Sequence, residues 1–313
     1  MLKFFYWITK KGPTVLALGC CIGIFLPSIA AYLRPMMPAM VFVFVLGTLL
    51  RIDNKKIIEA SKNIHISIIF PIIFVVACPY FLGWITKLLS GNDELALAVA
   101  LAVAAPPASG NSAVARMLKL DPSVALVSTL CSMIMIPVTA PLILYIFKGT
   151  LDIDINPSDL ALRLAILIGS AEGVALLIRR FAFKFVSQHG IAIDGVVISA
   201  LFIFAVGTMA GMQELILNNP YQVFLIILLV YAINFAMQVG CGVIFPGSLQ
   251  LKATIGLTAG NRNVGLLWSV LGMSISPTLL LVFACSQLPI HTMPKILQYV
   301  LPKLKITKQV EVT

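Results

Sequence analysis

The stretch PPASGN (residues 106–111) decides the fold of this chain, because it interrupts an apolar segment at residues 95–118. Each proline removes a backbone donor and clashes with the preceding helical turn, so no regular helix continues through it. Unpaired backbone groups cost several kcal/mol each in hydrocarbon. The interruption therefore predicts either a break beside a wet, solute-binding cavity or a kinked helix that packs on glycine without any ligand.

A second interruption, AGNRNV (residues 259–264), follows the related stretch SGNSAV (residues 109–114) at an offset of 150 positions. It places Asn261, Arg262 and Asn263 near the middle of a second apolar segment. The segment after each break also carries a Cys-Ser pair followed by two prolines. Together and in order, these matches indicate two related halves, residues 1–150 and 151–313.

The composition excludes a soluble protein. Of the 313 residues, 60% are hydrophobic and 11% are charged, and the mean hydropathy is +1.03. Soluble domains carry about 25% charged residues. The composition also excludes disorder and a disulfide scaffold, since the six cysteines all lie in apolar stretches. The basic N-terminus runs directly into an apolar segment, which predicts a retained signal anchor.

Ten segments approach the roughly 20 apolar residues that a helix needs to cross a bilayer. They are residues 13–33, 36–50, 66–89, 95–118, 123–147, 160–178, 196–212, 223–245, 253–270 and 277–297. Ten spans place both termini on one face, where 17 of the 22 Lys and Arg residues fall, against three on the other face. This bias predicts a multi-pass protein of the cell (inner) membrane with both termini in the cytoplasm.

Each half holds five spans, so the second half enters the membrane from the opposite side. Such inverted repeats with broken helices are typical of secondary transporters. The sequence therefore predicts an all-α polytopic membrane protein with ten transmembrane helices and two inverted five-helix repeats. Its broken fourth and ninth helices are expected to meet at a binding site.

With these features, the sequence resembles the bile acid:sodium symporter family, within a superfamily that also holds arsenite and auxin exporters. The resemblance covers nearly the whole chain and rests on the ten spans, the repeat and the two breaks. It implies that the broken helices cross within a core domain, here residues 66–147 and 221–297. It also implies a panel domain, here residues 13–50 and 158–212, with substrate between panel and core.

The chain departs from this family at positions that the family uses to hold sodium. The family's glutamate before the ninth-span glycine is Thr258 here, and its glutamine after that glycine is Arg262. Its Ser-Asn in the fourth span becomes Gly110-Asn111, so Asn111 and Asn263 match while the acidic ligand does not. The cysteine expected of an arsenite exporter near the fourth-span break is also missing.

A charge at mid-membrane costs at least about 2.5–3.5 kcal/mol, so Arg262 needs a partner or a role. We consider four alternatives for it and for Glu172 of the sixth span. Arg262 is a tethered cation that replaces sodium, or it clamps the carboxylate of a substrate. Alternatively, Glu172 is a proton-coupling carboxylate, or the two residues form a purely structural pair.

Other polar residues complete the predicted site. Asn234 and Gln238 share one face of the eighth span, where a ligand contact and a helix–helix contact are both expected. A sodium ion, if one binds, is expected near Asn111, Ser128, Thr129 and Asn263. Hydroxyl groups in membrane helices also bond their own backbone, which is the alternative for the fifth-span residues. The remaining candidates are Ser112 in the fourth-span break and Ser132 in the fifth span.

These features predict a secondary transporter that moves a small organic anion, bile-acid-like or another carboxylate, by alternating access. No P-loop is present to couple it directly to ATP, and scattered acids argue against a membrane enzyme or a sensor. Transport is expected to be coupled to sodium or to be sodium-independent, with a proton-coupled carrier or exporter as the alternative. The expected partners are the anion and the lipid bilayer, with no nucleic acid and no other cofactor, in a monomer or a homodimer.

Overall fold

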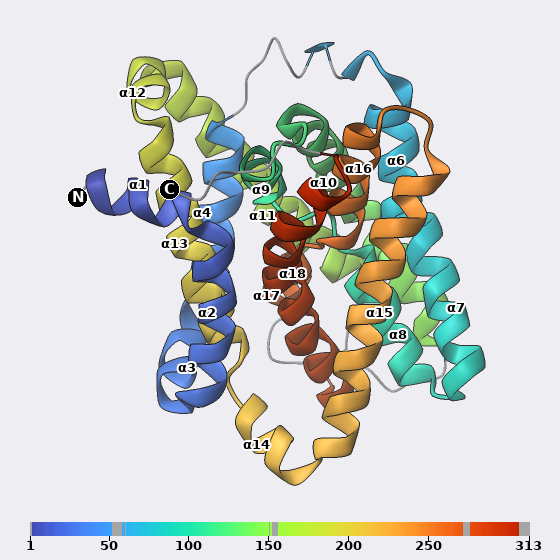
Figure 1. Ribbon diagram of the computed structural model, residues 1–313. Coiled ribbons are helices and arrows are strands. Elements are labelled where there is room, and N and C mark those ends of the chain that lie inside the picture. The colour runs from blue at the N-terminus through green and yellow to red at the C-terminus, as the bar shows by residue number, and fades with distance from the viewer. Residues whose placement is uncertain are drawn as a thin grey trace.

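The computed structural model describes residues 2–51, 58–59, 61–149, 151, 156–271 and 276–306, and Figure 1 shows that helices make up nearly all of them. The predicted all-α class is confirmed in this part of the chain. Its one departure from helix and loop is an isolated bridge between Pro107 and Arg262. The predicted boundary between the two halves lies between residues 150 and 151. Residues 150 and 152–155 lie outside the described part of the chain.

The helices of the first half begin with α1 (Leu2–Lys10), α2 (Gly12–Phe25), α3 (Pro27–Leu33) and α4 (Met37–Leu50). A third membrane segment runs from His65 to Ser90 and ends in α7 (Cys78–Ser90). Its start includes two π-helical turns, η2 (His65–Ile69) and η3 (Ile73–Ala77), which flank α6 (Phe70–Ile72). The half closes with α8 (Asp93–Ala104), α9 (Asn111–Met117) and α10 (Pro122–Lys148).

The second half contains α11 (Pro157–Phe181), α12 (Phe183–Gln188), α13 (Gly190–Thr208) and α14 (Met212–Asn218). It continues with α15 (Pro220–Ile244), α16 (Leu249–Gly260), α17 (Val264–Leu271) and α18 (Pro277–Lys303). Several helices carry Pro at the first turn, and α8, α10, α11, α16 and α18 begin with an Asn, Asp or Ser whose side chain accepts a backbone N–H. Both features are favourable at a helix start.

Seven helical segments of the described chain are long and apolar enough to cross a bilayer. Three predicted spans differ from them for a physical reason. The fourth and ninth spans are each divided into two short helices, α8 with α9 and α16 with α17. The first span is not one helix over residues 13–33, because Leu26 leaves the helical conformation before Pro27 and α2 ends at Phe25. The ten-span count and the inverted repeat stay predictions.

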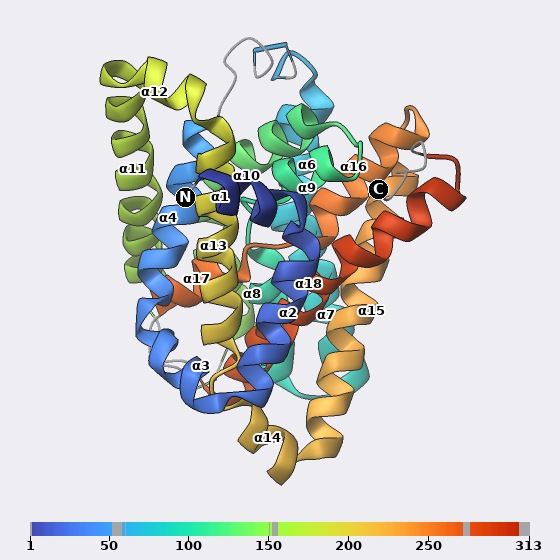
Figure 2. The same cartoon turned by 60° about the vertical axis from the view of Figure 1, so that its left-hand side comes forward.

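The helices pack in two neighbourhoods. Helices α2, α3 and α4 pack against α13, while α7, α10 and α18 pack against α8, and α15 packs against α16 and α18. Helix α11 contacts both α4 and α10, and α2 contacts α18, so these contacts join the two neighbourhoods. Figure 2 shows α11, α4 and α13 on one side of the molecule and α15 with α7 on the other. The division into panel and core domains stays a prediction.

Large apolar side chains cover the outward faces of these helices. Exposed examples include Phe25, Ile134, Val138, Tyr145 and Leu176. A water-soluble surface of this kind would aggregate, whereas a bilayer solvates it. This surface therefore agrees with a multi-pass membrane protein.

Candidate functional site

The two interruptions predicted from the sequence lie directly against each other. The backbone N–H of Ala108 donates to the Asn261 carbonyl at 2.8 Å, and that of Asn263 donates to the Pro106 carbonyl at 2.7 Å. The bridge between Pro107 and Arg262 is antiparallel. Each break thus supplies the backbone partners that the other lacks, which explains how irregular chain is tolerated inside a membrane protein.

Side chains tie the crossing together. The Asn111 amide donates to the Asn261 carbonyl at 3.1 Å, and the Asn263 amide donates to Ser109 Oγ at 3.2 Å. The Asn263 side-chain oxygen accepts from the backbone N–H of Leu266 at 3.2 Å. The Asn261 side-chain oxygen is buried without a hydrogen-bond partner in the described chain. The crossing therefore offers one unpaired oxygen acceptor.

Arg262 lies at the centre of the crossing and is 5% exposed. Its Nη1 donates at 3.3 Å to the carbonyl of Ala105, which caps the C-terminal end of α8. Its Cζ lies 5.1 Å from the centre of the Phe74 ring. Nε and Nη2 have no hydrogen-bond partner among the described residues. The guanidinium thus places its positive charge at a helix end that carries partial negative charge.

Helix α15 fits closely against α16 because Gly260 has no side chain. A Cβ at Gly260 would meet the Gln238 side chain and the Asn234 carbonyl. Asn234 Nδ2 donates to the Gly260 carbonyl at 2.8 Å, and Gln238 Nε2 donates to Asn234 Oδ1 at 2.7 Å. Asn234 thus pairs the last carbonyl of α16, and Gln238 holds the Asn234 side chain in place. This arrangement is the helix–helix contact that the sequence predicted as one alternative.

On another side of the fourth-span break lies a cavity of about 430 Å³, which we call the chamber. Its walls come from α4, the break, α9, the start of α10 and α13. The lining residues are Gly47, Thr48, Arg51, Ser109, Gly110, Ser112, Ala113, Arg116, Pro122, Ser123, Leu126, Asp194 and Val197. Of the predicted site residues, only Ser112 is among them. The chamber thus has both polar and apolar walls, contains three charged side chains, and joins the break to α4 and α13.

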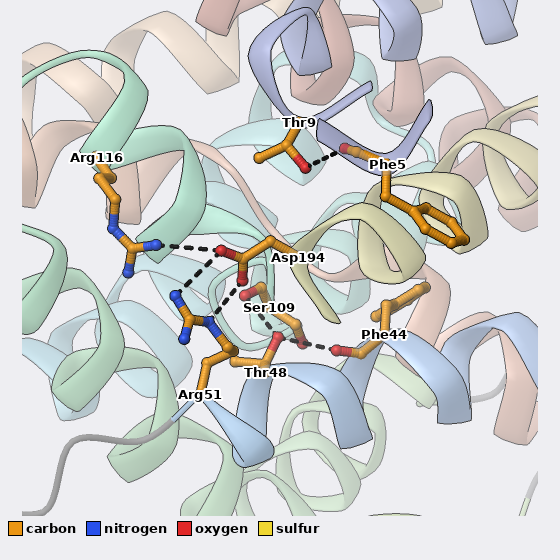
Figure 3. A network of polar contacts seen from close by, with 8 residues as sticks. All are labelled: Phe5, Thr9, Phe44, Thr48, Arg51, Ser109, Arg116 and Asp194. Carbon is orange, nitrogen blue, oxygen red and sulfur yellow. Dashed lines mark hydrogen bonds and ion pairs between the residues drawn. The ribbon is translucent and has the colours of Figure 1, made fainter. Parts of the chain in front are cut away.

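Two arginines of the chamber converge on one carboxylate, as Figure 3 shows. Arg51 Nε donates to Asp194 Oδ1 at 2.9 Å and Arg51 Nη2 donates to Asp194 Oδ2 at 3.2 Å. Arg116 Nη1 donates to the same Oδ2 at 3.2 Å. With two positive groups and one negative group, the cluster carries a formal charge of +1.

Each member of this cluster is positioned by its helix. Arg51 follows the last residue of α4, and Arg116 lies in the last turn of α9. A cation is favourable at either place because helix C-termini carry partial negative charge. Asp194 projects from the start of α13. Thr48, one turn before Arg51, donates at 2.9 Å to the Ser109 carbonyl and so links α4 to the break.

The predicted hydroxyl ligands mostly bond their own helices. Thr129 donates to the Ala125 carbonyl, Ser132 to the Ser128 carbonyl and Thr258 to the Thr254 carbonyl, each at 2.7 Å. Ser128 differs, because it donates at 3.3 Å to the Ile66 carbonyl in a π-helical turn of the third segment. These contacts agree with the backbone-bonding alternative, and a sodium site among these residues stays a prediction.

Glu172 does not join the site. It is exposed on α11, whereas Arg262 is buried, and no ion pair links the two among the described residues. The alternative of a structural pair between them is therefore wrong. The sequence indicates how deep in the membrane each residue lies. It does not show toward which neighbour a side chain points from its helix, and for this reason the prediction failed. A role of Glu172 in proton coupling stays a prediction.

Sequence reasoning missed Arg51, Arg116 and Asp194. Both arginines count among the 17 basic residues on the predicted cytoplasmic face, which accounts for them without a site. The one available signal was Asp194, since an acid flanked by apolar residues in the IAIDGVV stretch (residues 191–197) requires a partner. Its partners could not be named without the fold.

The chain was compared with known proteins. A family model described as the sodium bile acid symporter family matches residues 35–219, which is more than half of the chain. The comparison with curated proteins found no match.

Proposed function

The chain belongs to the sodium bile acid symporter family, and from that premise we propose that it is a secondary carrier for a small organic anion that works by alternating access. The chamber between the fourth-span break and helices α4 and α13 is the substrate site in this proposal. The formal charge of +1 on its ion cluster is the observation that supports an anionic substrate. A planar guanidinium suits carboxylate recognition especially well.

The walls of the chamber favour a hydrophilic anion over a steroid. Seven of its lining residues are Ser, Thr, Arg or Asp, three are Gly or Ala, and only Pro122, Leu126 and Val197 are larger apolar residues. A rigid apolar ring system gains affinity mainly by burying its surface against apolar side chains. Serine hydroxyls instead pair with oxygen atoms of a small carboxylate.

Arg262 supports a sodium-independent mechanism. Its guanidinium donates to the Ala105 carbonyl at the end of α8, where a freed carbonyl would otherwise be available to a metal cation. It does not line the chamber, so we assign it the role of a tethered cation and not that of a substrate clamp. The substrate's own gradient, or exchange for another anion, then drives transport.

The distribution of charge gives the orientation that we propose. Arg51, Arg116 and Lys119 lie at or beyond the ends of α4 and α9, beside the chamber. By the positive-inside rule this end faces the cytoplasm. The structure then corresponds to an inward-facing state, with both termini in the cytoplasm of a cell whose inner membrane holds the carrier.

The proposal is tested with purified protein in proteoliposomes loaded with unlabelled anion. Labelled succinate, pyruvate and taurocholate serve as probes, and counterflow is measured in sodium and in sodium-free buffer. We expect accumulation of succinate or pyruvate above taurocholate, and a loss of about tenfold or more in Arg51→Gln, since hydrogen bonds to charged groups are worth about 1.5–3 kcal/mol.

The matched control is Arg34→Gln, which removes the same charge from η1 (Arg34–Met36), outside the chamber. It should transport as the parent protein does. Equal losses in both variants would remove Arg51 from the substrate site. Absence of counterflow for all three probes in the parent protein would overturn the assignment to small carboxylates and bile acids.

A further inference from the structure

The ion cluster in the chamber joins two parts of the molecule unequally. Arg51 of the α4 end and Asp194 of α13 share two hydrogen bonds, and both helices belong to the neighbourhood of α2, α3, α4 and α13. Arg116 comes from α9, which continues the broken fourth span, and it reaches Asp194 through a single bond of 3.2 Å. The Arg51–Asp194 pair therefore lies within one helix group, whereas the Arg116–Asp194 pair joins two groups.

The exposure of the three side chains follows the same division. The Asp194 side chain is 11% exposed and that of Arg51 is 28% exposed, whereas that of Arg116 is 52% exposed. Gly190 packs directly on the Arg51 guanidinium, so that a Cβ at this position would collide with it. Arg51 and Asp194 are thus held in place, and Arg116 is the member that is free to change partners.

Movement of the broken helices relative to α4 and α13 must break the Arg116–Asp194 pair. The same movement leaves the Arg51–Asp194 pair intact, because these two residues move together. An ion pair of this exposure contributes modestly, in the range that shifts a conformational equilibrium by a few-fold. That range is large enough to set which state an empty carrier prefers and small enough for a substrate to overcome.

We propose that the Arg116–Asp194 ion pair is a latch that holds the empty carrier in the present conformation, and that the anionic group of a substrate releases it by capturing Arg116. Both parts rest on the proposed function: the latch requires alternating access, and the release clause also requires an anionic substrate. Substrate capture leaves no buried charge unpaired, since Asp194 keeps both bonds from Arg51. Arg116 already lines the chamber, as do the hydroxyls of Ser112 and Ser123.

The latch is tested first without any substrate. Ser123 lines the chamber, so Ser123→Cys is treated with a membrane-impermeant maleimide in carboxylate-free Tris chloride buffer, and the parent chain with its native cysteines gives the background rate. Arg116→Gln and Asp194→Asn should each slow the labelling of this cysteine at least twofold, because the chamber is open for a smaller share of the time. Lys119→Gln, which removes a nearby positive charge outside the chamber, should leave the rate unchanged.

Two variants guard against a folding defect, since Asp194→Asn leaves Arg51 without its carboxylate whereas Arg116→Gln changes a half-exposed side chain. Labelling of both variants at the rate of the Lys119→Gln control would overturn the latch. If Asp194→Asn does not fold, a slowed rate in Arg116→Gln supports the latch when Arg116→Lys restores the parent rate. A folded Asp194→Asn that is labelled at the control rate would contradict the latch.

The release clause is tested with labelled succinate. In the parent protein, exchange should exceed net uptake, because the empty inward-facing carrier must break the latch to return to the outward-facing state. Asp194→Asn should bring net uptake to within about twofold of exchange and lower the KM, while Arg116→Gln should raise the KM. If succinate is not transported but the labelling results hold, the latch stands and the proposed substrate class fails; an unchanged uptake-to-exchange ratio with active transport would refute the release clause.

Discussion

At the scale of single residues, the proposed independence from sodium depends on Arg262. It is 5% exposed, and its charge rests on the Ala105 carbonyl and the Phe74 ring. Two of its nitrogen donors lack partners in the described chain. Natural proteins seldom retain such an arrangement for stability, since unsatisfied buried donors cost about 1–3 kcal/mol each. Its retention at the crossing therefore agrees with a functional role.

Replacing Arg262 with glutamine should make transport depend on sodium. The parent protein should take up succinate equally in sodium and choline buffers. Arg262→Gln should lose about tenfold in choline, because a charged hydrogen bond worth about 1.5–3 kcal/mol is removed from the end of α8. Sodium should restore part of the loss, since the Ala105 carbonyl is then open to a free cation.

Uptake by proteoliposomes over a range of sodium concentrations provides this measurement, with Lys119→Gln as a control for charge. Equal transport by parent and variant, with and without sodium, would contradict the tethered-cation role. A rise with sodium in the parent protein itself would contradict it as well.

Site residues could be predicted from the sequence only where their place within a break marked them. Asn111, Asn261, Arg262 and Asn263 were selected by their places in the breaks, and all four lie at the crossing. Arg51, Arg116 and Asp194 were missed because their pairing joins residues that are 143 and 78 positions apart. No local pattern encodes a contact of this range.

At the scale of helices, the breaks act as one unit. The hydrogen bonds of Ala108 with Asn261 and of Asn263 with Pro106 make α8, α9, α16 and α17 meet at a single point. Loss of either break would leave the backbone of the other unpaired in a buried setting. The four short helices should consequently move together when the carrier changes conformation.

A second contact between helix groups involves α11 and α17. Arg163 Nη1 donates at 3.1 Å to the Val270 carbonyl near the C-terminal end of α17. Figure 2 shows this end of α17 well below α9 and the chamber-forming end of α4. Arg163 and Arg116 thus tie the broken helices to their neighbours at different heights.

Arg163→Gln should weaken this tie and favour states in which the chamber is closed. We expect labelling of the Ser123→Cys chain to slow about twofold, and the effect should add to that of Arg116→Gln, because distant sites act independently. The matched control is Lys184→Gln on α12, which is exposed. Faster labelling, or no change, would show that Arg163 does not stabilise the chamber-open state.

Helix positions were largely predictable because apolar length and proline spacing are local signals. Predicted span 123–147 is α10 (Pro122–Lys148), and span 223–245 is α15 (Pro220–Ile244). The first span was predicted too long, since the change of direction at Leu26 and Pro27 leaves hydropathy unchanged. The two π-helical turns of the third segment also gave no signal, because the pattern of apolar residues continues through them.

At the scale of the whole molecule, the arrangement is that of a carrier with its chamber at one end. Helix α12 lies toward the upper part of Figure 1, while α3 and α14 lie at the opposite end. The crossing is located between these two ends. In the proposed mechanism, a movement of the broken helices presents a solute held in the chamber to either side.

The central claim is that the fourth-span break is exposed alternately to the two sides of the membrane. Ser112 lies in the first turn of α9, directly after this break, and lines the chamber, so the most direct measurement is the labelling of Ser112→Cys by an impermeant maleimide added to one side of oriented vesicles at a time. We predict labelling from both sides, at rates that change in opposite directions when succinate is added. Labelling from one side only, with and without succinate, would contradict the account.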